Sequence, residues 1–326
     1  MKRSVLLLLL LVGMALPLQA QQHQSPKVVV SIKPIHSLTA AVMAGVGSPQ
    51  LLIKGAGSPH GYSMRPSEAR MLADADLVIW VGEGLETFLA RPLANLGGHA
   101  HQLELAHHLE SKMLPIREGG TWEGHGHDKR EHDTHEHDTH GHDKHGHNKH
   151  GHDHEELDYH LWTSPILAKD IVTLIAEHLM TVDPAHAATY AANAASLITK
   201  LDQLYHEVKN QLHLVAKVPY IVFHDAYQYF ERAFGLNAVG SVTIDTERSP
   251  GVRRVQEVRS KISEHGARAV FSEPQFQSRI VATVLEGTGA KAGVLDPLGA
   301  NLAEGPQVYF ALIREMGASI LATLEE

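Results

Sequence analysis

The chain has 326 residues, 43% of them hydrophobic and 20% charged, which is enough for about two globular domains. It contains no cysteine, and this excludes disulfides, thiolate zinc sites, iron–sulfur clusters and cysteine catalysis. It contains 26 histidines, and its net charge is −9 when these are neutral. The composition therefore indicates metal or proton chemistry carried by imidazole and carboxylate groups, and it offers no basic surface for nucleic acid.

The first 20 residues have the organisation of a cleavable secretory signal. Lys2 and Arg3 precede an apolar run at 5–12, and a small-residue cleavage sequence follows at 18–20. An uncleaved membrane anchor is the alternative, but the run is short for a span of about 20 residues. We therefore expect residues 1–20 to be a signal peptide that is removed on secretion.

Short apolar strands alternate with helical patterns in two separate parts of the chain. In the first part we expect strands at 28–32, 51–53 and 77–81, with helices beginning near 36, 65 and 85. In the second part we expect strands at 220–223, 238–244, 269–271 and 293–295, with helices beginning near 226, 252, 280 and 306. This alternation predicts an α/β fold with two lobes, each a mainly parallel β-sheet flanked by helices.

A long helical segment lies between these two parts and follows a helix expected at 165–180. Its apolar residues recur every three or four positions, at Tyr190, Ala194, Leu197, Leu201, Leu204, Val208 and Leu212. A coiled-coil dimer would carry a similar stripe. Because the segment lies inside an α/β chain, we predict a monomer in which residues 183–214 form one long connecting helix. The N-terminal lobe then covers 26–182 and the C-terminal lobe 215–326.

A histidine-rich tract of low complexity interrupts the first lobe at 124–154. It has too few apolar residues to offset the entropy of ordering, so we expect a loop that is disordered without metal. One interpretation makes the tract an accessory zinc collector, and the alternative is a solvated spacer with no required role. The weak zinc sites would be formed by His125, His127, His132, His135, His137, His140, His142, His145, His147, His150, His152 and His154.

Three histidines outside the tract, His60, His160 and His224, lie in loops that are expected to face a cleft between the lobes. Neutral imidazole suits Zn²⁺ at Zn–N distances of about 2.0–2.1 Å, and three such ligands leave one position for water or a carboxylate. Sequence spacing alone does not bring residues this far apart together. Four other histidines have no such setting and are expected on the surface: His36, His101, His107 and His108.

Two carboxylates stand beside the candidate ligands. Asp158 lies two residues before His160, and Asp225 directly follows His224. Either carboxylate would serve to orient an imidazole. The alternative is that each is a helix cap or a solvated loop residue, and Asp225 stands where it would cap a helix beginning at Ala226.

Four phrases in register carry a family resemblance. They are SPHGYSMRPS at 58–67, DYHLWTSP at 158–165, FHDAYQYF at 223–230 and LDPLG at 295–299, and they flank the histidine tract. With these phrases the chain closely resembles the zinc-uptake periplasmic binding proteins of the ZnuA type, which are metal receptors of ABC transporters. The resemblance implies a periplasmic location, Zn²⁺ as the bound substrate, and a membrane permease driven by an ATPase as the partner.

The resemblance also implies which residues bind the metal. His60, His160 and His224 match the metal-binding histidines, and Asp296 matches an acidic position at the site. Manganese-binding relatives carry a glutamate at the position of His224, so an imidazole there favours zinc. Some zinc-binding relatives have a glutamate before the first histidine, where this chain has Pro59. The fourth ligand is therefore Asp296, water or a histidine of the tract.

Two other classes of function compete with a transport receptor. A secreted zinc-dependent hydrolase also fits three histidines and a water, but the chain has no His-Glu-x-x-His or Gly-x-Ser-x-Gly motif, and we expect no enzyme. A histidine-rich zinc store or adhesin is the third class, and it would depend on the tract. For a receptor, the long connecting helix favours metal release by local loop rearrangement over wide opening of the lobes.

Overall fold

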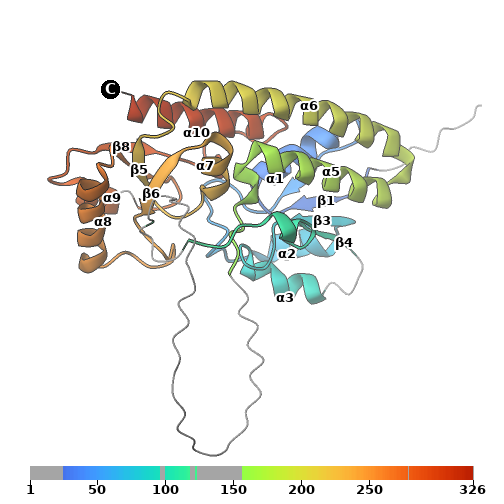
Figure 1. The fold of residues 1–326 in the computed structure, drawn as a ribbon. Helices are drawn as coiled ribbons and strands as arrows, with labels where there is room; N and C mark the ends of the chain where they lie inside the picture. The colour runs from blue at the N-terminus through green and yellow to red at the C-terminus, as the bar shows by residue number, and fades with distance from the viewer. Residues whose placement is uncertain (1–24, 96–99, 118–121, 123–155, 278, 326) are drawn as a thin grey trace, which may run out of the picture.

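The structure is a computed structural model, and it describes residues 25–95, 100–117, 122, 156–277 and 279–325. The predicted signal peptide and the histidine tract at 124–154 lie outside these described residues. The described chain forms two α/β lobes that lie side by side beneath a long helix (Figure 1).

The N-terminal lobe is built on a parallel sheet of four strands in the order β2-β1-β3-β4. Its strands are β1 (Val28–Val30), β2 (Gln50–Leu51), β3 (Leu77–Trp80) and β4 (His101–Glu104). Its longer helices are α1 (Lys33–Val42), α2 (Pro66–Ala73), α3 (Thr87–Asn95) and α5 (Pro165–Val182), and its short ones are α4 (Leu105–Leu109), η1 (Glu110–Lys112) and η3 (Leu161–Thr163). Every residue of β1 and β3 is buried, because helices cover both faces of the sheet.

Strand β4 was not expected from the sequence. It is an edge strand whose first two residues, His101 and Gln102, are exposed, and only Leu103 is fully buried. An edge strand with one buried residue lacks the continuous apolar run that marks the central strands. It is the parallel pairing with β3 that makes it a strand.

The C-terminal lobe repeats the architecture with a parallel sheet in the order β6-β5-β7-β8. Its strands are β5 (Pro219–Val222), β6 (Asn237–Ser241), β7 (Ala269–Ser272) and β8 (Lys291–Val294). Its helices are α7 (Gln228–Phe234), α8 (Val252–His265), α9 (Arg279–Leu285) and α10 (Val308–Leu324). Because the strands of each sheet are parallel, the loops after their carboxyl ends gather at one edge of the sheet, where a site can form.

The connecting helix is α6 (Ala187–Leu212), which follows the short helix η4 (Pro184–His186). Its buried residues are the seven of the predicted apolar stripe. Figure 1 shows α6 running over both lobes with α10 beside it. One hydrophobic core joins α6 to residues of both lobes, such as Ile171 and Phe230. The stripe is therefore buried within the chain itself, where a coiled-coil partner would have no access.

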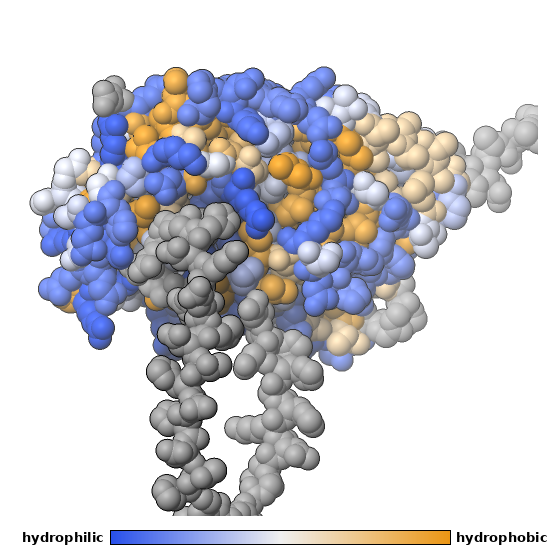
Figure 2. All heavy atoms as spheres, in the orientation of Figure 1, coloured by the Kyte–Doolittle hydropathy of each residue, from blue (hydrophilic) through white to orange (hydrophobic). Residues whose placement is uncertain are grey.

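The surface carries both hydrophilic and hydrophobic residues on the face that Figure 2 draws. Figure 2 shows hydrophilic residues spread over this face of both lobes, with hydrophobic residues gathered in smaller patches between them. Within the described residues, none of the helices combines the length and hydrophobicity needed to cross a bilayer.

The joint core predicts the effect of shortening an α6 side chain. Leu204 is fully buried, so Leu204→Ala is expected to lower the free energy of unfolding by about 2–5 kcal/mol. Denaturant unfolding of the mature chain measures this change. Gln203→Ala, at the exposed neighbouring position, is the control and should change the free energy of unfolding by less than about 0.5 kcal/mol. Equal effects of the two substitutions would contradict the assignment of the buried face.

Candidate metal centre

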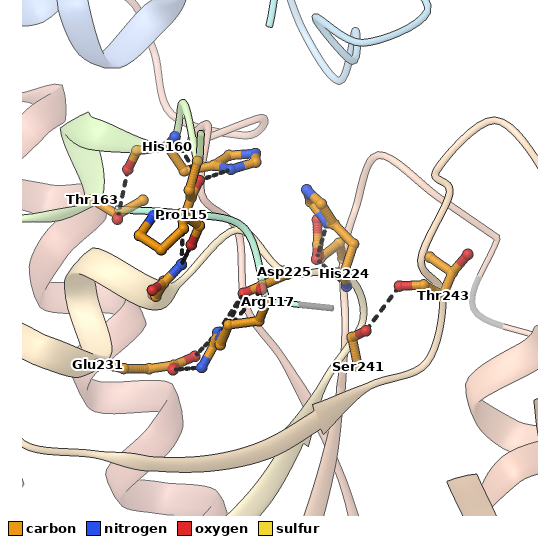
Figure 3. Close-up of polar contacts among 12 residues, drawn as sticks. Pro115, Arg117, His160, Thr163, His224, Asp225, Glu231, Ser241 and Thr243 are labelled. Atoms are coloured by element: carbon orange, nitrogen blue, oxygen red, sulfur yellow. Dashed lines mark hydrogen bonds and ion pairs between the residues drawn. The ribbon is translucent and has the colours of Figure 1, made fainter. Parts of the chain in front are cut away.

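Three histidines from three separate segments meet between the lobes. His60 lies in the loop between β2 and α2, His160 directly precedes η3, and His224 lies two residues after β5. His160 and His224 are buried and His60 is partly buried. Figure 3 shows His160 and His224 projecting from the two lobes toward the same space. The structure thus brings together the three candidate ligands that the sequence proposed.

The spacing of the three rings suits a metal ion. One nitrogen from each of His60, His160 and His224 lies within 4.8 Å of the others. His60 Nε2 and His160 Nε2 are 3.3 Å apart. Two nitrogens bound to a tetrahedral Zn²⁺ at about 2.0–2.1 Å lie roughly 3.3 Å from each other. This pair is therefore already at the separation that a shared zinc ion requires.

Carboxylates hold two of the rings in position. His160 Nδ1 lies 2.8 Å from Asp158 Oδ1, and His224 Nδ1 lies 2.7 Å from Glu273 Oε1. An ionised carboxylate only accepts, so the ring hydrogen belongs on Nδ1 and the lone pair on Nε2. The buried Nε2 of His224 has no hydrogen-bond partner in the described structure. Both rings therefore direct Nε2 toward the centre of the cluster, where that of His160 meets His60 Nε2 and that of His224 has no partner.

Of the two orienting carboxylates, the sequence suggested only Asp158. Glu273 follows directly after β7, and β7 is the sheet neighbour of β5, after which His224 stands. The signal for Glu273 was therefore an acidic residue at the carboxyl end of a strand. This signal identifies Glu273 as a partner of His224 only when the strand order is known, because the two residues are 49 positions apart in the chain.

The electrostatic setting differs between the rings. Burial, together with the neighbouring rings of His160 and His224, lowers the pKa of His60 to about 2. His60 is therefore neutral at neutral pH and ready to coordinate. Burial by itself would lower the pKa of His224 as well, but the charge and hydrogen bond of Glu273 outweigh it and raise that pKa above its usual value.

Asp296 is not part of the cluster. Its Oδ1 accepts hydrogen bonds from the backbone amides of Leu298 and Gly299 and from Gln275 Nε2, and its Oδ2 accepts one from the amide of Ala300. This pattern is that of an aspartate that closes a turn. Its oxygens are therefore engaged by the 296–300 loop and by Gln275.

Asp225 neither touches a candidate ligand ring through a hydrogen bond nor caps the following helix, whose N-cap is Tyr227. It accepts from Arg117 Nε at 2.9 Å, and Arg117 Nη1 donates to Glu231 at 2.7 Å (Figure 3). The guanidinium also lies 3.5 Å from the ring centroid of Trp122. The predicted role of Asp225 as a helix cap is wrong, because its carboxylate pairs with Arg117 instead. This network fixes the segment that leads into the histidine tract against the C-terminal lobe.

An open cleft of about 880 Å³ adjoins the cluster and is lined by all three histidines. Ile116, Arg117 and Glu156, which flank the histidine tract, line the same cleft. The two flanks are held together where the amide of Ile116 donates to the carbonyl of Glu156 at 2.8 Å. The described residues on either side of the tract are therefore held at the cleft, and the tract itself lies outside the described residues.

Direct contacts beside the cluster lock the lobes together. Trp162 Nε1, two residues from His160, donates to the carbonyl of Pro297 at 2.7 Å, and Tyr309 donates to the carbonyl of Trp162 at 2.8 Å. Lys33 Nζ lies 2.6–3.0 Å from three carbonyls of the 299–302 loop. These contacts limit relative movement of the lobes at the site.

The expectation of a surface position was wrong for His36. This residue is buried in α1, and its Nε2 lies 3.1 Å from the carbonyl of Pro49. A backbone carbonyl thus pairs with one ring nitrogen of this buried histidine, and the local sequence does not reveal such a contact. His101, His107 and His108 are exposed, as expected.

Two α/β lobes, a helix that spans both and a buried three-histidine cluster between them define a two-lobed binding protein for a transition-metal ion. The family model described as zinc-uptake complex component A, periplasmic, matches residues 28–323. The chain belongs to this family.

Individual relatives agree with this assignment. The high-affinity zinc uptake system protein ZnuA of Brucella abortus is 48% identical over 300 residues, covering 90% of both chains. The protein of the same name from Yersinia pestis is 32% identical over 306 residues, covering 92% of both.

Solved structures share the fold. A crystal structure of ZnuA covers 92% of this chain and 100% of its own, with a TM-score of 0.73 at 22% identity. The periplasmic zinc-binding protein TroA from Treponema pallidum has a TM-score of 0.75 at 19% identity, covering 93% of this chain and 100% of its own.

The bond between Glu273 and His224 predicts how this carboxylate affects metal binding. Glu273→Gln keeps the shape but removes the charge that holds the ring hydrogen on Nδ1. We expect zinc affinity, measured against a competing chelator, to fall roughly 10–100-fold. Glu315→Gln, at an exposed position of α10, is the matched control and should leave the affinity unchanged. Unchanged affinity in Glu273→Gln would contradict the orienting role.

Proposed function

We propose that this protein captures Zn²⁺ in the periplasm between its two lobes and delivers it to the permease of an ABC transporter for high-affinity zinc uptake. The convergence of His60, His160 and His224 carries this proposal, and family membership supports it. The high-affinity zinc uptake system proteins among the relatives match over nearly their full length, which supports the same role here.

The donor set favours zinc over harder metal ions. Three imidazole nitrogens suit Zn²⁺, whereas Mn²⁺ prefers oxygen donors. The two carboxylates that contact the cluster, Asp158 and Glu273, are occupied with ring nitrogens. We propose that they support the ligands and do not themselves bind the metal.

We propose that water from the adjoining cleft supplies the fourth ligand. The cleft reaches all three histidines, and a zinc site with three protein ligands commonly binds a water. Asp296 is less suited, because both of its oxygens accept hydrogen bonds from the 296–300 loop. A histidine of the tract remains the competing ligand in this proposal.

The position of the tract supports an accessory role. Both of its flanks line the cleft, so zinc ions held weakly by its histidines would be concentrated beside the central cluster. Release to the permease then requires that His60, His160 or His224 move away. The interlobe contacts of Trp162 and Lys33 favour movement of a loop, such as the one that carries His60, over separation of the lobes.

Two rival functions make different use of the same residues. A zinc hydrolase needs a general base near the metal-bound water. The carboxylates in contact with the cluster instead bind Nδ1 of ligand rings, which suits a site that holds a metal. A zinc store or adhesin would place its tightest binding in the tract at 124–154.

Zinc titration of the mature protein tests this proposal. His60→Ala, His160→Ala and His224→Ala are each expected to weaken the tightest site by more than the 10–100-fold typical of an orienting residue. Deleting 124–154 should lower the number of zinc ions bound and keep the tightest site. Loss of the tightest site in the deletion, or displacement of zinc by equimolar manganese, would refute the proposal.

Replacing one imidazole with a carboxylate should change the preference for metals. We expect His224→Glu to lower the ratio of zinc to manganese affinity, because an oxygen donor replaces a nitrogen donor. Glu273 would repel the new carboxylate, so the substitution is made together with Glu273→Gln and compared with Glu273→Gln alone. His206→Glu, at an exposed position of α6, is the control. A ratio equal to that of Glu273→Gln would contradict the role of His224.

A further inference from the structure

A second group of histidines gathers on the N-terminal lobe. His101 begins β4, His107 and His108 lie in α4, and His178 lies in α5. Three elements therefore contribute to the group, and β4 and α5 are both labelled in Figure 1. None of these histidines contacts the cluster formed by His60, His160 and His224.

The rings of this group are in direct contact. His101 Nε2 lies 2.8 Å from His178 Nδ1, and their ring centroids are 4.8 Å apart. The ring of His108 lies 5.2 Å from that of His178, centroid to centroid, in an edge-on arrangement. The ring of His107 follows at 5.5 Å from His108.

The group is well separated from the central cluster. His160 directly precedes the turn that leads into α5, whereas His178 lies near the other end of this helix. His178 lies 13 positions after Pro165, which corresponds to about 20 Å along the helix at 1.5 Å per residue. A metal ion bound by His178 is therefore separate from one bound by His160.

The chemical state of the rings suits metal binding. Partial burial and the neighbouring rings of His101 and His108 lower the pKa of His178 to about 4. Its ring is therefore neutral at neutral pH and has a lone pair. A neutral imidazole is a common ligand of first-row transition metals.

We propose that His101, His108 and His178 form a second site for a divalent transition-metal ion, occupied by Zn²⁺ in zinc-loaded protein. The two bonded nitrogens must separate from 2.8 Å to the roughly 3.3 Å of a tetrahedral zinc site, and the exposed side chain of His108 must rotate toward them. These adjustments and the exposure of the rings give this site a lower affinity than the central cluster. Water molecules complete the coordination.

Residue-specific modification of the full mature chain tests the second site without interference from zinc bound elsewhere. Diethyl pyrocarbonate modifies free imidazole, and mass spectrometry reports the rate at each histidine with and without zinc chloride. We expect His101 and His178 to react several-fold more slowly once zinc exceeds the capacity of the central cluster and the tract. The exposed His206 serves as the internal reference.

The variant His101→Gln makes the test specific. Removing one ligand should abolish the protection of His178 by zinc, whereas His206→Gln should leave that protection intact. The proposal is overturned if zinc protects neither His101 nor His178, or if His178 stays protected in His101→Gln. Protection of His60, His160 and His224 is recorded in the same experiment, so failure of the second site is distinguished from failure of the proposed transport function.

Discussion

The apolar stripe of α6 packs into one core with both lobes, and the geometry of the metal cluster depends on this contact. His60 and His160 belong to one lobe and His224 to the other, so their nitrogens converge only if the lobes keep a fixed relation. Contacts close to the cluster add to this constraint, among them the bond from Trp162 to the carbonyl of Pro297. A binding protein built in this way holds its ligands in place before the metal arrives, which reduces the ordering cost of binding.

Each lobe contributes one carboxylate that orients one imidazole. Asp158 acts on His160 and Glu273 acts on His224, and both bonds leave Nε2 directed at the same point. The two bonds come from different local structures, one from a residue two positions away and one from a neighbouring strand. Burial strengthens both interactions, because they act in a medium of lower dielectric constant than water. The result is a site in which two of the three rings are held by a carboxylate on the side away from the cluster.

The histidines of this chain divide by environment into distinct roles. The central three are shielded and held by the protein, and their cleft is also lined by Ile116, Arg117 and Glu156, which precede and follow the histidine tract in the chain. Those at the edge of the N-terminal lobe are largely exposed, and their rings contact one another. We expect a zinc site to have lower affinity when its ligand side chains are held less firmly before binding. A loosely held ligand loses more conformational freedom when the metal binds. With the two proposed sites, zinc would be collected at the surface and retained between the lobes.

The sequence by itself determined the α/β rhythm, the stripe of α6 and, through its resemblance to a family, the three histidines between the lobes. These features follow from local periodicity and from short sequence motifs, which can be recognised without knowledge of the fold. Only the tertiary structure decided that Glu273 orients His224, that Asp296 closes a turn and that Asp225 binds Arg117. It also decided that edge strand β4 brings His101 to His178. The reason is that these outcomes depend on strand order and helix packing, which join residues far apart in the chain, whereas a sequence pattern reports only on near neighbours.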